Sequence, residues 1–175
     1  MAKMSSKGKN IKTRIKGFEI RHAERKDVGL IRSLIRDLAE YEKMLDEMVA
    51  TEELLEKHLF GKKRFVEVVL GYYNDVPAGF ALFFHNFSTF VGKPGLYLED
   101  LYVKPEHRGK GLGKALLAYL AKLAVERDCG RYEWCVLNWN EPSLKFYKML
   151  GARVMDEWLI HRVTGDALQK LADQF

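Results

Sequence analysis

The stretch "LYLEDLYVKPEHRGKGLGKALL", residues 96–117, decides which fold this sequence can adopt. Residues 96–103 are mostly apolar and aromatic, which predicts a strand. A glycine-rich loop follows at residues 108–113, and apolar residues then recur at helical spacing up to about Asp128. A strand, a glycine loop and a helix in this order bring backbone amides and the positive end of a helix dipole to one point. The stretch therefore predicts an α/β fold with a loop that binds an anion.

The glycine loop does not match either of two common nucleotide-binding patterns. A Walker A loop requires a glycine at the position of Arg108 and a hydroxyl side chain at that of Ala115. The dinucleotide-binding pattern requires a third glycine at the position of Lys114. The remaining interpretation is a loop whose amides bind phosphate oxygens together with the side chains of Arg108 and Lys110. The alternative is a flexible turn with solvated basic residues, and the adjoining strand and helix favour anion binding over it.

The composition is that of one globular domain, which we expect at residues 18–175. The chain has 175 residues, of which 47% are hydrophobic and 30% are charged. It lacks an apolar stretch of the roughly 20 residues that span a membrane, and its N-terminus lacks a secretory h-region. We therefore expect a cytoplasmic protein without a membrane partner.

The net charge of +5 has its source in residues 1–17, which contain six basic residues and no acidic residue. The remainder is close to neutral, so we expect no nucleic-acid partner for the folded domain. Residues 1–17 are predicted to form a basic, disordered tail, and a weak polyanion-binding arm is the alternative.

The cysteines and histidines do not indicate a metal site. Cys129 and Cys135 are the only cysteines, and the five histidines are scattered along the chain without ligand-type spacing. A disulfide framework would need more than this one close pair. We expect both cysteines to be reduced and structural, and no metal to be bound.

Hydrophobic periodicity predicts a single mixed sheet with helices packed on it. Asp27 and Thr51 fit the N-cap positions of two helices, and Asn74-Asp75 is a turn signal between two strands. The predicted strands are residues 18–23, two strands within 64–87, and residues 96–103, 131–137 and 157–163; the predicted helices are residues 28–43, 52–60, the glycine loop to 128, 142–150 and a C-terminal helix from 166. The order β-α-α-β-β-β-α-β-α-β predicts an α/β (α+β) fold with a mixed, mostly antiparallel sheet flanked by helices.

Three stretches together resemble one enzyme superfamily. Residues 108–113 match the R-x-x-G-x-G/A signature of the GNAT superfamily of acetyl-CoA-dependent N-acetyltransferases, and the predicted element order is that of the GNAT fold. "NWNEPSLKFYKMLGA" (138–152) and "LIRDLAEYEK" (34–43) look like parts of spermidine/spermine N-acetyltransferases and their thialysine N-acetyltransferase relatives. The resemblance covers residues 18–163. It implies a homodimeric enzyme that transfers acetyl from acetyl-CoA to the primary amine of a thialysine-like amino acid, a diamine or a polyamine.

Acetyl transfer to an amine requires a base, because a primary alkylammonium has a pKa of about 10.4. The resemblance places Glu99 at the base position, acting through a water molecule, with Asp100 beside it on the substrate side. Alternation along a strand lets only one of these neighbours point to a given face. The alternative is a solvated or cation-paired carboxylate pair, but its position inside an apolar strand favours function. The resemblance also places Tyr147 as the acid for the leaving sulfur, and a core aromatic is the alternative.

The coenzyme-binding residues that the resemblance implies come from three places. Backbone groups of the strand 96–103 would meet the pantetheine arm, the glycine loop would meet the pyrophosphate, and residues within 138–152 would complete the site. Ser143 is equally well explained as a first-turn residue of the predicted helix. The full set is Leu101, Val103, Arg108, Gly109, Lys110, Gly111, Leu112, Gly113, Lys114, Asn140 and Ser143.

The acceptor side is expected at Tyr41 and Glu42, which match a substrate-side pair in the polyamine enzymes; a solvated helix end is the alternative. Where those enzymes have an aspartate before a tryptophan, this chain has Ser88-Thr89 followed by Phe90. This difference favours the thialysine-type branch over long polyamines. Two further functions stay open, a protein acetyltransferase acting on N-termini or lysines and a non-catalytic acetyl-CoA sensor. The presence of both proposed catalytic residues argues against the sensor.

Overall fold

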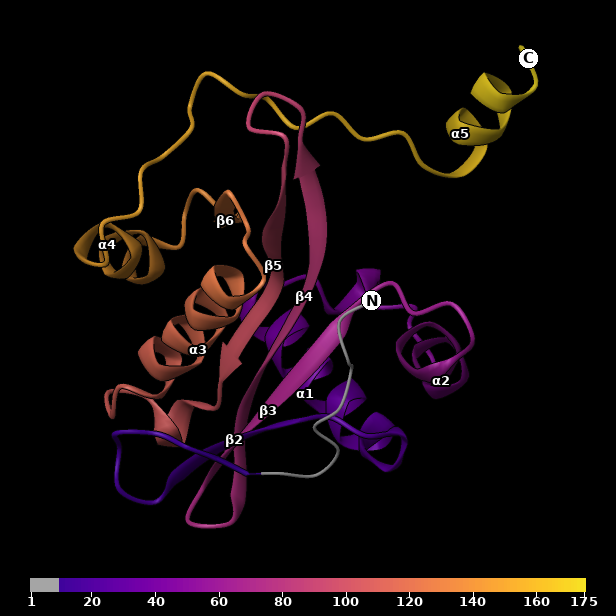
Figure 1. Ribbon diagram of the computed structural model, residues 1–175. Coiled ribbons are helices and arrows are strands. Elements are labelled where there is room, and N and C mark those ends of the chain that lie inside the picture. The colour runs from indigo at the N-terminus through magenta and orange to yellow at the C-terminus, as the bar shows by residue number, and fades with distance from the viewer. Residues whose placement is uncertain (1–9) are drawn as a thin grey trace. The chain divides into compact units, whose positions relative to one another are not determined.

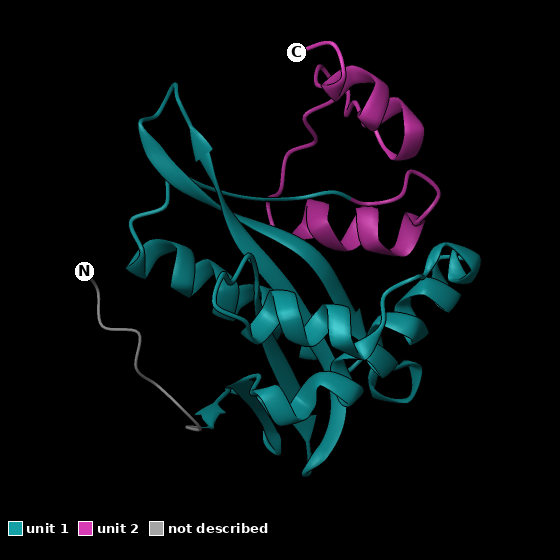
Figure 2. Cartoon of the chain, turned by 90° about the vertical axis from the view of Figure 1, so that its right-hand side faces the viewer, with its two compact units in different colours: residues 1–135 teal, residues 136–175 magenta. Residues whose placement is uncertain are grey.

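The computed structural model describes residues 10–175. The chain divides into two compact units, Met1–Cys135 and Val136–Phe175, which Figure 2 shows in different colours. The first unit contains the sheet, and the second contains the last two helices.

The first unit is built on a six-stranded sheet in the order β1-β2-β3-β4-β5-β6 (Figure 1). Its strands are β1 (Ile11–Lys12), β2 (Phe18–His22), β3 (Glu67–Tyr73), β4 (Val76–Ser88), β5 (Lys93–Val103) and β6 (Arg131–Trp134). Neighbouring strands are antiparallel except β5 and β6, which are parallel. This mixed, mostly antiparallel sheet with flanking helices confirms the predicted fold class.

The helices among residues 10–175 are α1 (Val28–Tyr41), α2 (Glu52–Phe60), α3 (Leu112–Glu126), α4 (Glu141–Met149) and α5 (Gly165–Ala172), with short 3-10 turns η1 (Arg25–Asp27), η2 (Leu45–Glu47) and η3 (Pro105–His107). Local sequence signals account for two helix starts. The Thr51 hydroxyl accepts a hydrogen bond from the Leu54 amide at 3.2 Å and caps α2 as predicted. Asp27 precedes α1 as predicted, but its carboxylate accepts hydrogen bonds from Arg21 at 2.7 and 2.8 Å and does not cap the helix.

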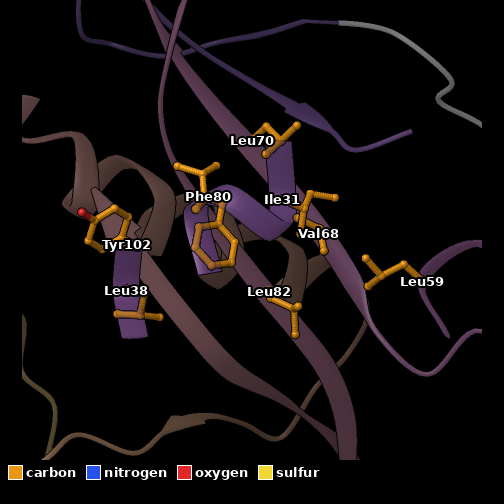
Figure 3. Packing of buried hydrophobic residues seen from close by; sticks show 9 residues of the cluster. Ile31, Leu38, Leu59, Val68, Leu70, Phe80, Leu82 and Tyr102 are labelled. Atoms are coloured by element: carbon orange, nitrogen blue, oxygen red, sulfur yellow. The ribbon is translucent and has the colours of Figure 1, made fainter. Parts of the chain in front are cut away.

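The core of the first unit lies between α1 and one face of the sheet. Ile31, Leu34 and Leu38 recur at helical spacing and are buried against this face. Figure 3 shows most of the cluster, to which α2 and the sheet contribute Leu59, Val68, Leu70, Phe80, Leu82 and Tyr102. Because Tyr102 belongs to β5, this core holds the strand on which the predicted catalytic carboxylates lie.

Helix α3 packs on the opposite face of the sheet. Phe83 alternates with the core residue Leu82 and so points to this face, where the Arg127 guanidinium lies 5.7 Å from its ring centre. Arg127 also binds the carboxylate of Glu67 at 2.9 Å, at the start of β3. These contacts fix the C-terminal end of α3 over β3 and β4, and the glycine loop leads into its other end.

The structure departs from the predicted elements near both ends of the chain. Ile11–Lys12 were expected in a disordered tail, whereas they form β1 and pair with β2. Residues 1–9 of that predicted tail lie outside the described residues. The predicted strand at 157–163 is wrong, since the segment forms no strand, and Trp158 and Leu159 are 69% and 80% exposed. Aromatic and β-branched residues give a segment strand propensity, but a strand also needs a neighbour to pair with.

Candidate active site

A β-bulge interrupts β5 at Glu99. In the ladder with β4, Leu98 pairs with Phe83. The next pair is Asp100 with Leu82, so Glu99 is the extra residue. Directly paired residues share a face of the sheet, so Asp100 faces α1 with Leu82, whereas Leu98 faces α3. The bulge therefore turns Asp100 toward α1 and leaves Glu99 exposed where the alternation of side chains is broken.

Three carboxylates meet where α1 ends against β5. Glu42 directly follows α1, and its charge acts on Asp100 together with that of Glu99. Burial, more than these two charges, raises the pKa of Asp100 to about 7. Burial also raises the pKa of Glu42. The structure thus brings three predicted acceptor-side residues together, in an acidic group suited to attract an ammonium ion and to exchange a proton with it.

Asp100→Asn is expected to stabilise the protein above neutral pH. The folded-state pKa of Asp100, about 7, lies above its ordinary value, so the stability that Asp100 contributes is present in acid and lost as the pH rises through 7. Asparagine has no charge to bury, so the variant should exceed the wild type by on the order of 1–2 kcal/mol in free energy of unfolding at pH 8 and by less at pH 5. Urea unfolding at both pH values measures the difference. A gain that does not grow with pH contradicts the raised pKa, and Glu126→Gln on the exposed side of α3 is the control.

β5 loses its second neighbour at the level of the bulge. The ladder with β6 ends at the pair of Leu98 and Trp134. From Glu99 onward, the edge of β5 that faced β6 has no strand partner among the described residues of the first unit. Leu101 and Val103, the predicted contacts of the pantetheine arm, lie in this part of the strand. An extended ligand can therefore lie along β5 where a strand is missing.

The glycine loop comprises the residues between η3 and the first turn of α3. Gly109 and Gly111 have φ values of 74° and 80°, in the left-handed region that favours glycine. A Cβ at Gly109 would meet no atom within 4 Å. The amides of residues 109–111 donate no hydrogen bond within the described part of the chain, and those of residues 112–114 lie in the first helical turn, which offers them no backbone acceptor. The loop therefore combines open space, amide donors and a helix dipole, as an anion site requires.

The two basic side chains of the loop lie against aromatic rings. The guanidinium carbon of Arg108 is 4.6 Å from the ring centre of Tyr41 and 5.5 Å from that of Tyr102. The Lys110 ammonium is 4.9 Å from the ring centre of Tyr73. Arg108 thus connects the glycine loop to the end of α1. The Arg108 Nε also donates a hydrogen bond to the Val103 carbonyl at 2.8 Å, and a contact between this guanidinium and a phosphate stays a prediction.

A cavity of about 450 Å³ lies between α1 and the segment that joins β5 to the glycine loop. The sequence indicated Tyr41 and Arg108 but not the other residues of this cavity. The spacing of Asp37, Glu40 and Tyr41, which places them on one helix face, is the signal that was missed. Carboxylates beside aromatic rings suit a small cation. The lining residues are Asp37, Glu40, Tyr41, Tyr102, Lys104, Pro105, Glu106 and Arg108.

Three further predicted site residues belong to α4 in the second unit. Asn140 is buried, and its side-chain oxygen accepts a hydrogen bond from the Ser143 amide at 3.3 Å, which caps the helix. Ser143 is thus a first-turn residue, as its alternative interpretation proposed. Tyr147 is half-buried, with its ring centre 5.5 Å from that of Phe146. The roles of these residues toward the coenzyme stay predictions.

Residues 10–175 present neither a metal-binding cluster nor a membrane-spanning helix. No group of three or more His, Cys, Asp or Glu side chains is placed there to hold a metal ion. None of the helices in this range is both long enough and apolar enough to cross a bilayer. Cys129 is half-buried and Cys135 is exposed, and both are free cysteines.

Comparisons with known proteins point to one family. The sequence model described as the acetyltransferase (GNAT) family matches residues 31–152. A thialysine N-epsilon-acetyltransferase of Sus scrofa is 37% identical over 164 residues, which cover 87% of this chain and 96% of that protein. An L-ornithine N5-acetyltransferase of Arabidopsis thaliana is 48% identical over 99 residues, which cover 56% of this chain and 43% of that protein. The solved structure of an integron cassette protein of V. cholerae matches with a TM-score of 0.76 and 28% identity, over 89% of this chain and 98% of that one.

Proposed function

The chain belongs to the acetyltransferase (GNAT) family and is an N-acetyltransferase, and from this premise we propose that it transfers acetyl from acetyl-CoA to the primary amine of a small molecule. The observation that carries the proposal is the course of β5. This strand bears the acidic pair at its bulge, loses its β6 neighbour there, and leads through η3 into the glycine loop. One strand therefore joins a site suited to an amine to a site suited to a phosphate-bearing coenzyme.

The residues of the first unit fit coenzyme A. The amides of residues 109–114 and the dipole of α3 suit the pyrophosphate, and the free edge of β5 beyond Leu98 suits the pantetheine arm. When bound, acetyl-CoA supplies an activated thioester carbonyl. The part of this chain is to hold the coenzyme along β5 and to present an amine beside it.

The acidic group provides the attraction and the base. Glu42, Glu99 and Asp100 draw in the acceptor as an ammonium ion, which must lose a proton before its nitrogen can attack. We assign this proton to Glu99, because its carboxylate is exposed at the bulge and accessible to an entering amine or a water molecule. Asp100, half-buried beside it, balances the positive charge of the acceptor.

A thialysine-like amino acid or a short diamine is the favoured acceptor within this proposal. Two of the relatives are named for thialysine and for ornithine. Ser88 stands in the segment where the polyamine enzymes have an acidic residue; it is buried, and its hydroxyl accepts a hydrogen bond from the Val91 amide at 3.3 Å. The position thus serves the β4–β5 turn and offers no charge to the far ammonium of a long polyamine.

A panel of acceptors tests the substrate class, with release of free coenzyme A thiol as the readout. The panel comprises thialysine, lysine, ornithine, a short diamine, spermidine, spermine and a peptide with a free N-terminus. We expect turnover of thialysine-like amino acids or the short diamine, and weak or no turnover of spermine and the peptide. Efficient turnover of spermine or of the peptide, with the small amines inert, would reject the proposed class.

The proposed enzyme is a homodimer, as the resemblance implies. Apolar side chains at the β4–β5 turn support a contact with a second copy, since Phe87, Phe90 and Val91 are 61%, 94% and 56% exposed. Light scattering should then give twice the chain mass of 20.3 kDa. A mass of one chain at micromolar concentration would refute the dimer.

Tyr147→Phe is expected to lower turnover while leaving acetyl-CoA binding nearly intact. The phenylalanine ring fills the same half-buried space beside Phe146, but it cannot donate a proton or a hydrogen bond to the leaving sulfur. The loss in kcat should be on the order of 10²-fold and should persist at alkaline pH, where free amine does nothing for the leaving group. Steady-state kinetics from pH 7 to 10, with a binding titration, measure both quantities. An unchanged kcat in this variant, or a loss of acetyl-CoA affinity alone, would contradict the role of Tyr147 as the acid.

A further inference from the structure

The first unit also places part of the basic N-terminal segment beside the glycine loop. We propose that Arg14 and Lys16 form the subsite for the 3′-phosphate on the ribose of the coenzyme, an inference that rests on the proposed use of acetyl-CoA. Both residues precede the family match, which begins at residue 31. The family match therefore assigns no role to either residue.

The chain makes an ordered turn between β1 and β2. The Thr13 hydroxyl accepts a hydrogen bond from the Ile15 amide at 3.1 Å and donates one to the Phe18 carbonyl at 2.8 Å. The Phe18 amide donates to the Ile15 carbonyl at 3.0 Å. Gly17 has a φ of 77°, and its carbonyl accepts from the Asn74 amide at 2.7 Å. The turn is thus held by β2 and by the β3–β4 turn.

This turn packs on the glycine loop. The Cδ1 atom of Ile15 lies 3.4 Å from the position that a Cβ on Gly111 would occupy. Tyr73, at the end of β3, adds a second link, since its ring centre is 5.8 Å from that of His107 and 4.9 Å from the Lys110 ammonium. In Figure 1 the turn between β1 and β2, in indigo, lies beside the segment that leads into α3. A segment outside the family match therefore borders the proposed phosphate site.

Arg14 and Lys16 flank the contact between Ile15 and the glycine loop. Successive Cα atoms are about 3.8 Å apart, so both basic side chains start next to this contact. Both residues are exposed, and neither forms an ion pair within residues 10–175. Lys12 lies opposite Glu19 across the β1–β2 ladder and is not part of the subsite. Two unpaired cations here raise the positive potential at the edge of an anion-binding loop.

The chemistry of the coenzyme selects its 3′-phosphate as the partner. The pyrophosphate suits the loop amides and the dipole of α3, which bind anionic oxygens without a side chain. The 3′-phosphate is a monoester with a charge of roughly −1.5 to −2 at neutral pH, and it binds most strongly to cationic side chains. An arginine and a lysine separated by a single residue can both reach this group.

Calorimetry can measure the binding of coenzyme A and of 3′-dephospho-coenzyme A, which differ only in the 3′-phosphate. The comparison distinguishes the contribution of the 3′-phosphate from that of the pyrophosphate and needs no turnover. The wild type should bind coenzyme A about 10-fold more tightly than the dephospho form. Arg14→Gln with Lys16→Gln should raise the Kd of coenzyme A by about 10-fold and leave that of the dephospho form unchanged. The preference for the 3′-phosphate then disappears in the double variant.

The matched control is Lys62→Gln with Lys63→Gln, which removes the same charge from two exposed residues. They precede β3 at the end opposite Tyr73, about 20 Å away along the strand. The control should keep the wild-type preference for coenzyme A over its dephospho form. If both double variants lose this preference equally, net charge explains the effect and the subsite is overturned. If replacing Arg14 and Lys16 weakens the binding of both ligands equally, these cations contact the pyrophosphate, and the 3′-phosphate subsite is again overturned.

The same titration separates this inference from the proposed function. A wild type that binds neither ligand overturns the proposed cofactor, and the subsite with it. A wild type that binds coenzyme A, with the preference unchanged when both cations are replaced, overturns the subsite alone.

Discussion

Glu99→Gln should lower kcat/KM for acetyl transfer by about 10²–10⁴-fold at pH 7, the usual contribution of a general base. Glutamine keeps the shape of the exposed side chain at the β5 bulge, but it cannot accept the proton of the ammonium. The defect should shrink as the pH rises toward the amine pKa of about 10.4, because solvent then supplies the neutral amine. Turnover measured from pH 7 to 10 therefore gives a curve that converges on the wild type.

Two comparisons make this result specific. Glu126→Gln removes the same charge from an exposed position on α3 and should leave the whole profile unchanged. Asp100→Asn tests the neighbouring carboxylate, whose pKa of about 7 also suits a proton acceptor. Near-native turnover of the Glu99 variant, together with a pH-dependent loss in the Asp100 variant, would transfer the role of the base to Asp100.

Gly109→Val is expected to raise the Kd of coenzyme A by roughly 30- to 100-fold, equivalent to losing one or two charge-assisted hydrogen bonds. Gly109 has a φ of 74°, which a β-branched residue adopts only with strain, so the loop amides should turn away from the phosphate position. The valine side chain would also project into the open space before the loop, where no protein atom lies within 4 Å of the Cβ position. Equilibrium titration with coenzyme A measures the change.

Gly92→Val is the matched control for backbone strain. Gly92 lies in the β4–β5 turn with a φ of 69°, and a Cβ there also meets nothing within 4 Å. Both variants should lose similar stability in thermal unfolding, but only the Gly109 variant should lose affinity for the coenzyme. Retained affinity in a folded Gly109→Val protein would contradict binding of the pyrophosphate at this loop.

Sequence reasoning succeeded where a few neighbouring residues determine the local structure. Asn74 and Asp75 form the predicted turn with φ values of 49° and 64°, because their short polar side chains tolerate the left-handed region. Thr51 caps α2 through an amide three residues away. The strand, loop and helix of residues 96–117 form as predicted, because periodicity and glycines specify each of them locally.

Prediction from the sequence was incomplete where a structure depends on residues distant in the chain. Strand propensity was present in residues 157–163, but no strand forms there, and Ile11–Lys12 form one because β2 is available to pair. The stacking of Arg108 on Tyr41 and Tyr102 likewise could not be predicted from the sequence, because it requires the end of α1 to lie against the end of β5.

The family, the reaction class and the order of strand, glycine loop and helix could all be predicted from the sequence, because they depend on residue types at short spacing. The presentation of the acidic pair depends instead on strand pairing in the folded chain. Pairing of β5 with β4 inserts Glu99 as a bulge and turns Asp100 toward α1, where burial and two nearby carboxylates raise its pKa. The packing of the turn around Ile15 on Gly111 also depends on the folded chain, because the two residues lie far apart in the sequence. Registers and such contacts arise from pairing across the fold, and no local run of residues specifies them.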